Sequence, residues 1–203
     1  MVNEGNFQEA VEGAAGVLSK GGVIAYPTET LYGLGAVLSR EDALERIRRI
    51  KGKAEPILVL VSGEEMAERY VEVDERARLL MKKFWPGPLT LILRAKPGVA
   101  EKVRAGSSGL GIRMSSDQFA QALVERAGEA VTSTSANRSG KEPMAGALEI
   151  EAEFGAELDL IVDAGNRTGK ASTVIDLLGE KPRLVREGQI QWKELQPVIP
   201  WQE

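Results

Sequence analysis

The stretch GGVIAYPTETLYGLGA, residues 21–36, places a short apolar strand directly before a loop of hydroxyl-bearing side chains. Residues 23–26 are predicted to form a buried strand that ends at Pro27, because proline lacks a backbone donor and fixes φ. Thr28 and Thr30 then lie on a loop held by a rigid element, an arrangement typical of ligand sites. The alternative interpretation is an ordinary strand-to-helix turn whose threonines cap the helix.

Two glycines, Gly33 and Gly35, close this stretch. Glycine adopts backbone angles closed to other residues and lets the backbone approach a ligand closely. Neither this pair nor Gly109 with Gly111 is followed by a third glycine at the spacing of a dinucleotide-binding loop. A bound nucleotide would therefore need another kind of cradle.

The composition describes a globular protein without histidine or cysteine. The 203 residues are 43% hydrophobic and 28% charged, which is enough for one good core and predicts one domain. Without cysteine there are no disulfides, thiolate nucleophiles or zinc–thiolate sites, and without histidine there is no Ser-His-Asp triad or histidine general base. Chemistry must rest on carboxylates, lysine, arginine, hydroxyls, backbone amides or a carboxylate-bound Mg²⁺.

Net charge and hydropathy indicate which partners and which cellular compartment to expect. The net charge of -4 argues against a broad nucleic-acid-binding surface, although a local one stays possible. No apolar run approaches the roughly 20 residues of a membrane span. The N-terminal sequence MVNEGNFQEA is polar and acidic, unlike a signal peptide. We therefore expect a cytoplasmic protein with no membrane contact.

Helical and strand patterns alternate along the chain with short breaks. Helices are predicted over residues 6–20, 41–51, 74–84, 117–126 and 147–154, with another beginning near residues 62–65. Strands are predicted over residues 23–26, 57–61, 89–93, 110–114, 130–132, 160–162, 173–177 and 183–185. Ser39 and Ser62 each precede an acidic residue by three positions, the pattern of a helix-capping pair. Continuous apolar strands between helices predict an α/β fold with a mixed sheet flanked by helices.

A basic run of five cations extends from Arg46 to Lys53 and crosses the helix stop at Gly52. Cations favour a helix C-terminus, so one interpretation is a solvated helix end. The functional interpretation is an anion clamp in which Lys51 and Lys53, in the loop after the helix, point at phosphates. The sequence alone leaves both open.

Polar residues also gather at the ends of other predicted strands. Residues 133–140, STSANRSG, follow the strand at 130–132 directly. Six polar side chains exceed what a turn requires, which predicts a ligand site. Arg113, Ser172 and Arg186 lie at or beside strand ends, where each taken alone is more often a surface residue than a ligand contact.

Seven motifs are spread over roughly residues 7–190: PTETLYGLGA, IKGK, WPGPLT, GLGIRM, STSANRSG, ASTVIDL and LVREG. In their order and spacing, the chain resembles the YrdC/Sua5/TsaC family of threonylcarbamoyl-AMP synthases. The resemblance implies an open twisted α/β sheet with a concave, positively charged pocket, in a single domain over residues 1–203. It also implies a nucleotidyltransferase that converts L-threonine, bicarbonate and ATP to threonylcarbamoyl-adenylate and pyrophosphate. A downstream threonylcarbamoyl transferase would complete the t⁶A modification of tRNA.

The resemblance also implies roles for individual residues. Threonine would be held by Thr30, Arg113, Ser133 and Ser172. ATP and its phosphates would be held by Lys51, Lys53, Ser135, Asn137 and Arg186, with the two lysines acting in catalysis. Mg²⁺ is expected to accompany the triphosphate, because the sequence shows no dedicated carboxylate cage. Adenylation of a carbamate needs no side-chain nucleophile, since positioning and charge neutralisation can supply most of the acceleration.

The phosphate loop departs from the family pattern. Its Lys-x-Arg pair is Lys51 and Lys53 here, and the following loop, residues 54–56, is shorter. Lysine lacks the bidentate fork of arginine, and Glu55 places an anion near the expected triphosphate. Leu60 stands where some members have histidine. The alternative hypothesis is therefore a non-catalytic or altered relative that keeps the pocket to bind RNA or a nucleotide.

Overall fold

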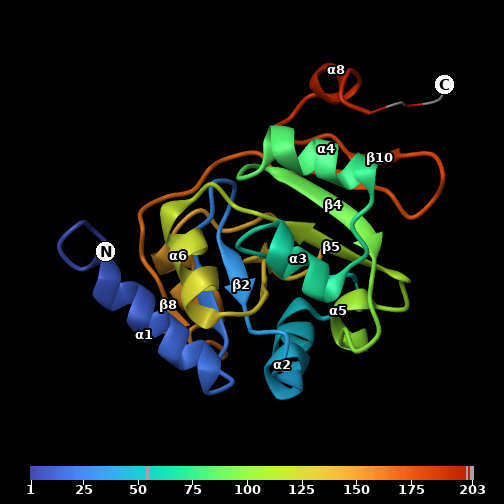
Figure 1. The fold of residues 1–203 in the computed structure, drawn as a ribbon. Coiled ribbons are helices and arrows are strands. Elements are labelled where there is room, and N and C mark those ends of the chain that lie inside the picture. Colours follow the sequence, from blue (N-terminus) through green and yellow to red (C-terminus); the bar gives the residue numbers. More distant parts are fainter. Residues whose placement is uncertain (54, 200, 202–203) are drawn as a thin grey trace.

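The computed structural model describes residues 1–53, 55–199 and 201, which form two mixed β-sheets with helices packed around them (Figure 1). The described helices are α1 (Phe7–Ser19), α2 (Glu41–Lys51), α3 (Glu64–Tyr70), α4 (Glu75–Phe84), α5 (Glu101–Arg104), α6 (Gln118–Ala127), α7 (Ala147–Phe154) and α8 (Trp192–Leu195). The described strands are β1 (Ile24–Tyr26), β2 (Gly33–Gly35), β3 (Val59–Leu60), β4 (Leu89–Arg94), β5 (Gly109–Arg113), β6 (Val131–Thr132), β7 (Thr134–Ser135), β8 (Leu160–Ile161), β9 (Thr173–Asp176) and β10 (Arg183–Arg186). The predicted α/β class is confirmed.

The strands divide between two sheets, where the sequence analysis expected one. The smaller sheet has the order β7-β2-β1-β8, and the larger has the order β10-β9-β4-β5-β3-β6. Both are mixed: β1 is antiparallel to β2 and parallel to β8, while β4 is antiparallel to β5 and parallel to β9. An antiparallel bridge between Val37 and Val131 joins the chain after β2 to β6. This arrangement leaves space between the sheets.

The decisive stretch at residues 21–36 forms a β-hairpin. Its loop leads into β2, so the interpretation as a strand-to-helix turn is wrong. Gly33 and Gly35 are required for space, because a Cβ on Gly35 would lie 2.7 Å from Cε1 of Tyr26 and one on Gly33 would lie 2.8 Å from Oγ of Ser133. The ring of the fully buried Tyr26 thus packs against the two glycines of β2. The polar loop therefore leads directly into a closely packed strand of the core.

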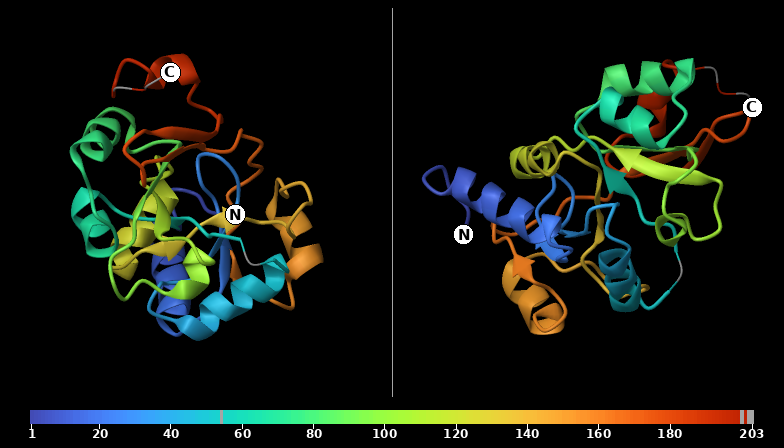
Figure 2. Two further views of the ribbon diagram at one scale, coloured as in Figure 1. Left: turned by 90° about the vertical axis from the view of Figure 1, so that its right-hand side faces the viewer. Right: turned by 60° about the horizontal axis from the view of Figure 1, so that its bottom comes forward.

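Helices cover the sheets with their apolar faces. Helices α1 and α6 lie side by side, and the buried faces of these helices include Leu18 and Leu123 (Figures 1 and 2). Helix α4 lies along the larger sheet near β4 and buries Leu80 (Figure 1). Complete burial of a leucine side chain contributes about 1.5–3 kcal/mol. The apolar helix faces predicted from the sequence are therefore the faces that pack in the core of the protein.

The helix ends confirm some predicted signals and correct others. Gly52 ends α2 in the left-handed conformation with φ of 72°, as its position predicted. The predicted capping by Ser39 and Ser62 is wrong. The Ser39 hydroxyl donates to Glu129, and that of Ser62 donates to the sulfur of Met66. The partner of Ser39 lies 90 positions along the chain, whereas that of Ser62 is only four residues away, within α3.

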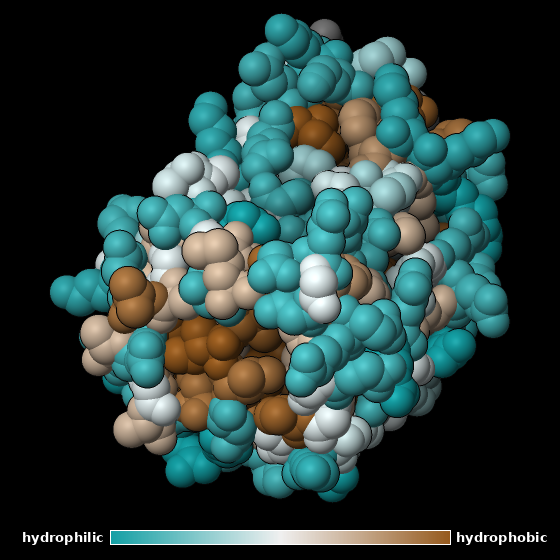
Figure 3. All heavy atoms as spheres, turned by 90° about the vertical axis from the view of Figure 1, so that its left-hand side faces the viewer, coloured by the Kyte–Doolittle hydropathy of each residue, from teal (hydrophilic) through white to brown (hydrophobic). Residues whose placement is uncertain are grey.

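The side of the molecule that carries α1 and β8 shows an apolar area surrounded by polar residues (Figure 3). Strand β8 is an edge of the smaller sheet, and partly buried apolar side chains on these elements include Val17 and Leu160.

Across residues 1–53, 55–199 and 201, no helix has the length and apolar character needed to cross a membrane.

Candidate active site

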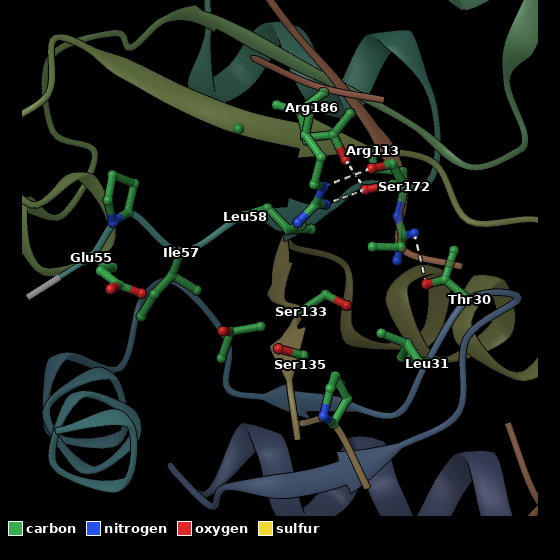
Figure 4. Close-up of a pocket in the computed structure, with 18 of the residues that line it drawn as sticks. Thr30, Leu31, Glu55, Ile57, Leu58, Arg113, Ser133, Ser135, Ser172 and Arg186 are labelled. Atoms are coloured by element: carbon green, nitrogen blue, oxygen red, sulfur yellow. Dashed lines mark hydrogen bonds between the residues drawn. The ribbon is translucent and has the colours of Figure 1, made fainter. Parts of the chain in front are cut away.

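A cavity of about 400 Å³ lies between the two sheets. The smaller sheet contributes Gly33 and Ser135 to its wall, and the larger sheet contributes Thr90, Arg113 and Val174. The cavity is lined by all the residues proposed from the sequence except Lys53, namely Thr30, Lys51, Arg113, Ser133, Ser135, Asn137, Ser172 and Arg186. Figure 4 labels six of them: Thr30, Arg113, Ser133, Ser135, Ser172 and Arg186. Residues more than 150 positions apart in the chain thus meet at one site.

The loop after β1 is fixed by its own hydroxyls. Oγ1 of Thr28 lies 2.9 Å from Oγ1 of Thr30 and donates to the carbonyl oxygen of Leu31 at 2.7 Å. Both threonine side chains are buried. Such local side-chain bonds stabilise a turn in place of a backbone ladder. Thr30 is therefore held in one position at the cavity wall.

Arg113 ends β5 and is only 2% exposed. Its NH1 donates to Oγ1 of Thr30 at 3.1 Å and lies 3.2 Å from Oε1 of Glu29. Its Nε has no hydrogen-bond partner among the described residues. Burial lowers the pKa of the Arg113 guanidinium, and the Glu29 carboxylate acts in the opposite direction. A buried donor without a partner is costly, which indicates that a ligand supplies the acceptor.

A second arginine, Arg186, lies close to Arg113 at the end of β10 (Figure 4). Its Nε donates to the carbonyl oxygen of Ser172 at 3.1 Å, and its NH2 donates to Oγ of Ser172 at 3.3 Å. Oγ of Ser172 also lies 2.9 Å from Oγ1 of Thr90. Burial lowers the pKa of Arg186, and repulsion from Arg113 lowers it further. Two cations that repel one another favour an anionic ligand between them.

At the end of the cavity away from Arg113, Lys51 anchors residues 133–137, the STSAN segment. Its Nζ donates to the carbonyl oxygen of Ser135 at 2.9 Å, and to the carbonyl oxygen and Oδ1 of Asn137, both at 2.7 Å. An ammonium group has three donors, and all three are used here. Burial lowers the pKa of Lys51 to about 8, while the charge of Glu55 acts in the opposite direction. The cation is therefore already satisfied by protein oxygens.

The serines of this segment lie at and between the two short strands β6 and β7. Ser133 lies between β6 and β7, and its backbone nitrogen donates to the carbonyl oxygen of Leu58 at 2.9 Å. Ser135 ends β7, and its hydroxyl donates to Oδ1 of Asn137 at 2.6 Å. The Ser133 hydroxyl has the bare backbone of Gly33 beside it. Both hydroxyls therefore belong to the cavity wall.

The basic run does not form one clamp. Lys51 is the last residue of α2, not part of the following loop, and Lys53 is exposed and outside the cavity lining. Arg46 pairs with Asp159 at 2.7 Å, and Nε of Arg48 donates to the carbonyl oxygen of Lys102. Most of the run therefore stabilises the fold around α2. Its role at the site rests on Lys51.

Glu55 lines the cavity mouth and is itself exposed. Oγ of Ser139 donates to its Oε2 at 3.4 Å, which links the loop after α2 to the STSANRSG segment. Ala54, part of the shortened loop, lies outside the described residues. Leu60 is buried and does not line the cavity, whereas Leu58 does.

Sequence reasoning missed several residues of the site. Thr90 lies in the WPGPLT motif, and its position in β4 could have been found from strand alternation. Leu89 and Leu91 face one side, so Thr90 and Ile92 face the cavity. The contact of Glu29 with Arg113 depends on the meeting of two distant segments and had no signal in the sequence.

Comparisons with known proteins agree with this geometry. The Sua5/YciO/YrdC family model, described as "Telomere recombination", matches residues 16–188. The chain belongs to this family. Residues 16–188 contain the polar loop, both arginines and the STSAN segment, so the whole candidate site lies within the family's shared region.

Relatives with known names support a common fold. The chain is 37% identical over 190 residues to the threonylcarbamoyl-AMP synthase of Pyrococcus abyssi, covering 92% of this chain and 56% of the relative. The structure of P. abyssi Sua5 complexed with L-threonine superposes with a TM-score of 0.88 at 36% identity, over 93% of this chain and 57% of the other. E. coli YciO superposes with a TM-score of 0.85 at 34% identity, over 95% and 94% of the two chains. The chain thus spans about half the length of the named synthase.

Proposed function

We propose that this chain is a threonylcarbamoyl-AMP synthase, a nucleotidyltransferase that uses L-threonine, bicarbonate and ATP. Relatives named as this enzyme, and one relative's structure with L-threonine, support the proposal. The product would serve t⁶A modification of tRNA in the cytoplasm, through a downstream threonylcarbamoyl transferase and with possible RNA contact.

The observation that carries the proposal is the free edge of Arg113. Its NH1 side is occupied by Thr30, while its buried Nε has no hydrogen-bond partner in the described part of the chain. A carboxylate that accepts from Nε and a terminal nitrogen would make the two parallel bonds typical of arginine. Ser133 and Ser172, on either side, offer hydroxyls to the amine and hydroxyl of the amino acid.

The reaction follows from groups that this site can position. The amine of threonine joins the carbon of bicarbonate with loss of water, and the resulting carbamate oxygen attacks the α-phosphorus of ATP. A P–O bond forms, the P–O bond to the β-phosphate breaks, and pyrophosphate leaves. Arg186 and Lys51 would neutralise phosphate charge, with Lys53 nearby as a further cation. Ser135 and Asn137 would hold the nucleotide by hydrogen bonds.

Mg²⁺ would enter with the nucleotide and supply charge neutralisation on the phosphates. Among the described residues, no cluster of three or more acidic side chains could hold a metal ion by itself. Glu55 is a carboxylate in the cavity wall. One carboxylate together with substrate phosphates is a common way for proteins to hold Mg²⁺. The cavity is therefore compatible with a Mg²⁺ ion that is held mainly by the triphosphate, with Glu55 as one carboxylate nearby.

The proposal is tested by pyrophosphate release from ATP, with and without L-threonine and bicarbonate, at several Mg²⁺ concentrations. We expect release only when both co-substrates are present, with a threonylcarbamoyl-adenylate product identified by mass spectrometry. Folded protein that binds threonine and ATP and still releases no pyrophosphate would overturn the proposal.

A second candidate function is an altered family member that binds RNA or a nucleotide without this reaction. It is favoured by the phosphate end of the cavity, where the donors of Lys51 are used by protein and Lys53 is exposed. Salt-sensitive RNA binding without threonine-dependent pyrophosphate release would support it.

A further inference from the structure

Glu29 lies behind Arg113, on the far side from the ligand cavity. It belongs to the loop after β1, and its side chain is 13% exposed. It does not line the cavity between the sheets, but lines a separate hollow with Glu4, Asp117 and Arg167. A carboxylate in this position does not reach a substrate directly. Any effect of Glu29 on the reaction must act through Arg113.

The Glu29 carboxylate connects two segments of the chain. Its Oε2 accepts from the hydroxyl of Ser115, two residues beyond the end of β5, and its Oε1 lies 3.2 Å from NH1 of Arg113. The backbone nitrogen of Asp117 also donates to Oγ of Ser115, at 3.2 Å, which holds that serine in place. Ser115 thus fixes the Glu29 carboxylate in its position beside Arg113.

This contact determines which edge of the guanidinium faces the cavity. An arginine side chain has several rotatable bonds, and its terminal nitrogens can exchange places by rotation. NH1 donates to Thr30 and forms an ion pair with Glu29, whose Oε1 accepts no hydrogen bond from the described residues, so the Nε edge is left for a ligand. A guanidinium buried beside a second cation, Arg186, also gains from an anion on its other side.

We propose that Glu29, held by Ser115, is a positioning residue that orients Arg113 for the carboxylate of the amino-acid substrate. The proposal rests on the proposed function, because it assumes an amino acid in the cavity. Two effects of Glu29 oppose one another, and this makes the proposal testable. As a positioning group it strengthens carboxylate binding, whereas as a nearby anion it weakens binding by repulsion. Loss of the charge distinguishes them by the sign of the change.

The experiment measures binding of L-threonine and of L-threoninamide, which lacks the carboxylate charge, by calorimetry. Glu29→Gln is compared with wild type and with Glu4→Gln, which removes a carboxylate from the same hollow. We expect Glu29→Gln to weaken threonine binding about tenfold and to reduce the preference for threonine over threoninamide, because the variant removes the negative charge paired with the guanidinium while it keeps an oxygen at the same place. Glu4→Gln should change neither. In the enzyme assay KM for threonine should rise while kcat and KM for ATP change little.

Two further variants keep the test valid if Glu29→Gln fails to fold, which thermal unfolding would show. Glu29→Asp should recover part of the threonine affinity, and Ser115→Ala should lose a smaller part with the same loss of carboxylate preference. Unchanged or tighter threonine binding in Glu29→Gln would overturn the positioning role. Wild-type protein that binds no threonine would instead count against the proposed function.

Discussion

The two ends of the cavity recognise anions in different ways. At the end formed by Thr30, Arg113 and Ser172, buried side chains are held by the protein, while Nε of Arg113 has no partner among residues 1–53, 55–199 and 201. At the end formed by Lys51 and Asn137, the cation is buried as well, yet all of its donors bind protein oxygens. The arginine end is ready for an anion, whereas the lysine end is complete without one.

This difference indicates an order of recognition. A ligand carboxylate at Arg113 restores a missing hydrogen bond without displacing any other. A phosphate at Lys51 must replace at least one of the oxygens of Ser135 and Asn137, so the STSAN segment has to shift. We therefore expect the amino acid to bind the free protein and the nucleotide to bind with a local rearrangement.

The largest effect is expected from Lys51→Ala. It leaves the oxygens of Ser135 and Asn137 without their donor, which costs about 1–3 kcal/mol of stability, and it removes the cation from the phosphate end. We expect undetectable pyrophosphate release and a lowered Tm. Lys51→Arg serves as the control that keeps the charge. Near-normal release by folded Lys51→Ala would contradict a role for Lys51 at the phosphates.

Arg113→Ala tests the arginine end of the cavity. Loss of the buried guanidinium should raise KM for threonine by about 30-fold or more, the effect of roughly 2 kcal/mol for a lost charged pair. KM for ATP should change much less. Arg113→Lys keeps the charge but loses the two-bond geometry, so it should restore only part of the affinity. Steady-state kinetics with each substrate varied would measure this, and an unchanged threonine KM would refute the assignment.

The pH dependence separates the two cations. Lys51, with a pKa of about 8, is charged below that pH and loses its charge as the pH rises through it. We expect kcat/KM for ATP to fall above pH 8 and the Lys51→Arg variant to lose this decline, because arginine stays protonated. Threonine binding, which depends on Arg113, should not change over the same interval. A pH profile identical in wild type and Lys51→Arg would contradict this division.

Lys53→Ala is expected to have the smallest effect. The side chain is exposed and outside the cavity lining, so it can attract phosphate only as a screened surface charge. We expect KM for ATP to rise by less than about threefold and the change to vanish at high salt. Arg49→Ala, an exposed cation on α2, is the matched control. A loss as large as that of Lys51→Ala would show that Lys53 reaches the nucleotide.

The sequence predicted most elements, and eight of the nine residues proposed for the site line the cavity. Strand ends followed by hydroxyls, such as Thr28 and Thr30 after β1, carry a local signal, because side chains at the end of a buried strand lie on a fixed loop. Family resemblance then placed Arg113, Ser172 and Arg186 in one pocket, and the structure brings them together. The two-sheet arrangement was not predicted, because β2 and β7 are too short to give a periodic pattern.

Contacts between residues far apart in the chain were the second feature that the sequence could not predict. The bonds from Lys51 to Asn137 and from Glu29 to Ser115 each join segments 86 residues apart. Nothing in either segment alone specifies the other. The same is true of Ser39, whose partner Glu129 made local capping rules fail. Which cation is free for a ligand depends on such contacts and cannot be read from charge spacing.

The most direct test of the central claim is a calorimetric titration of nucleotide-free protein with L-threonine, alongside L-threoninamide. The account predicts binding of one threonine per chain without ATP and little or no binding of the amide, because the free edge of Arg113 requires a carboxylate. Threonine binding only after ATP, or equal binding of the amide, would show that the arginine end is not built in advance for this substrate.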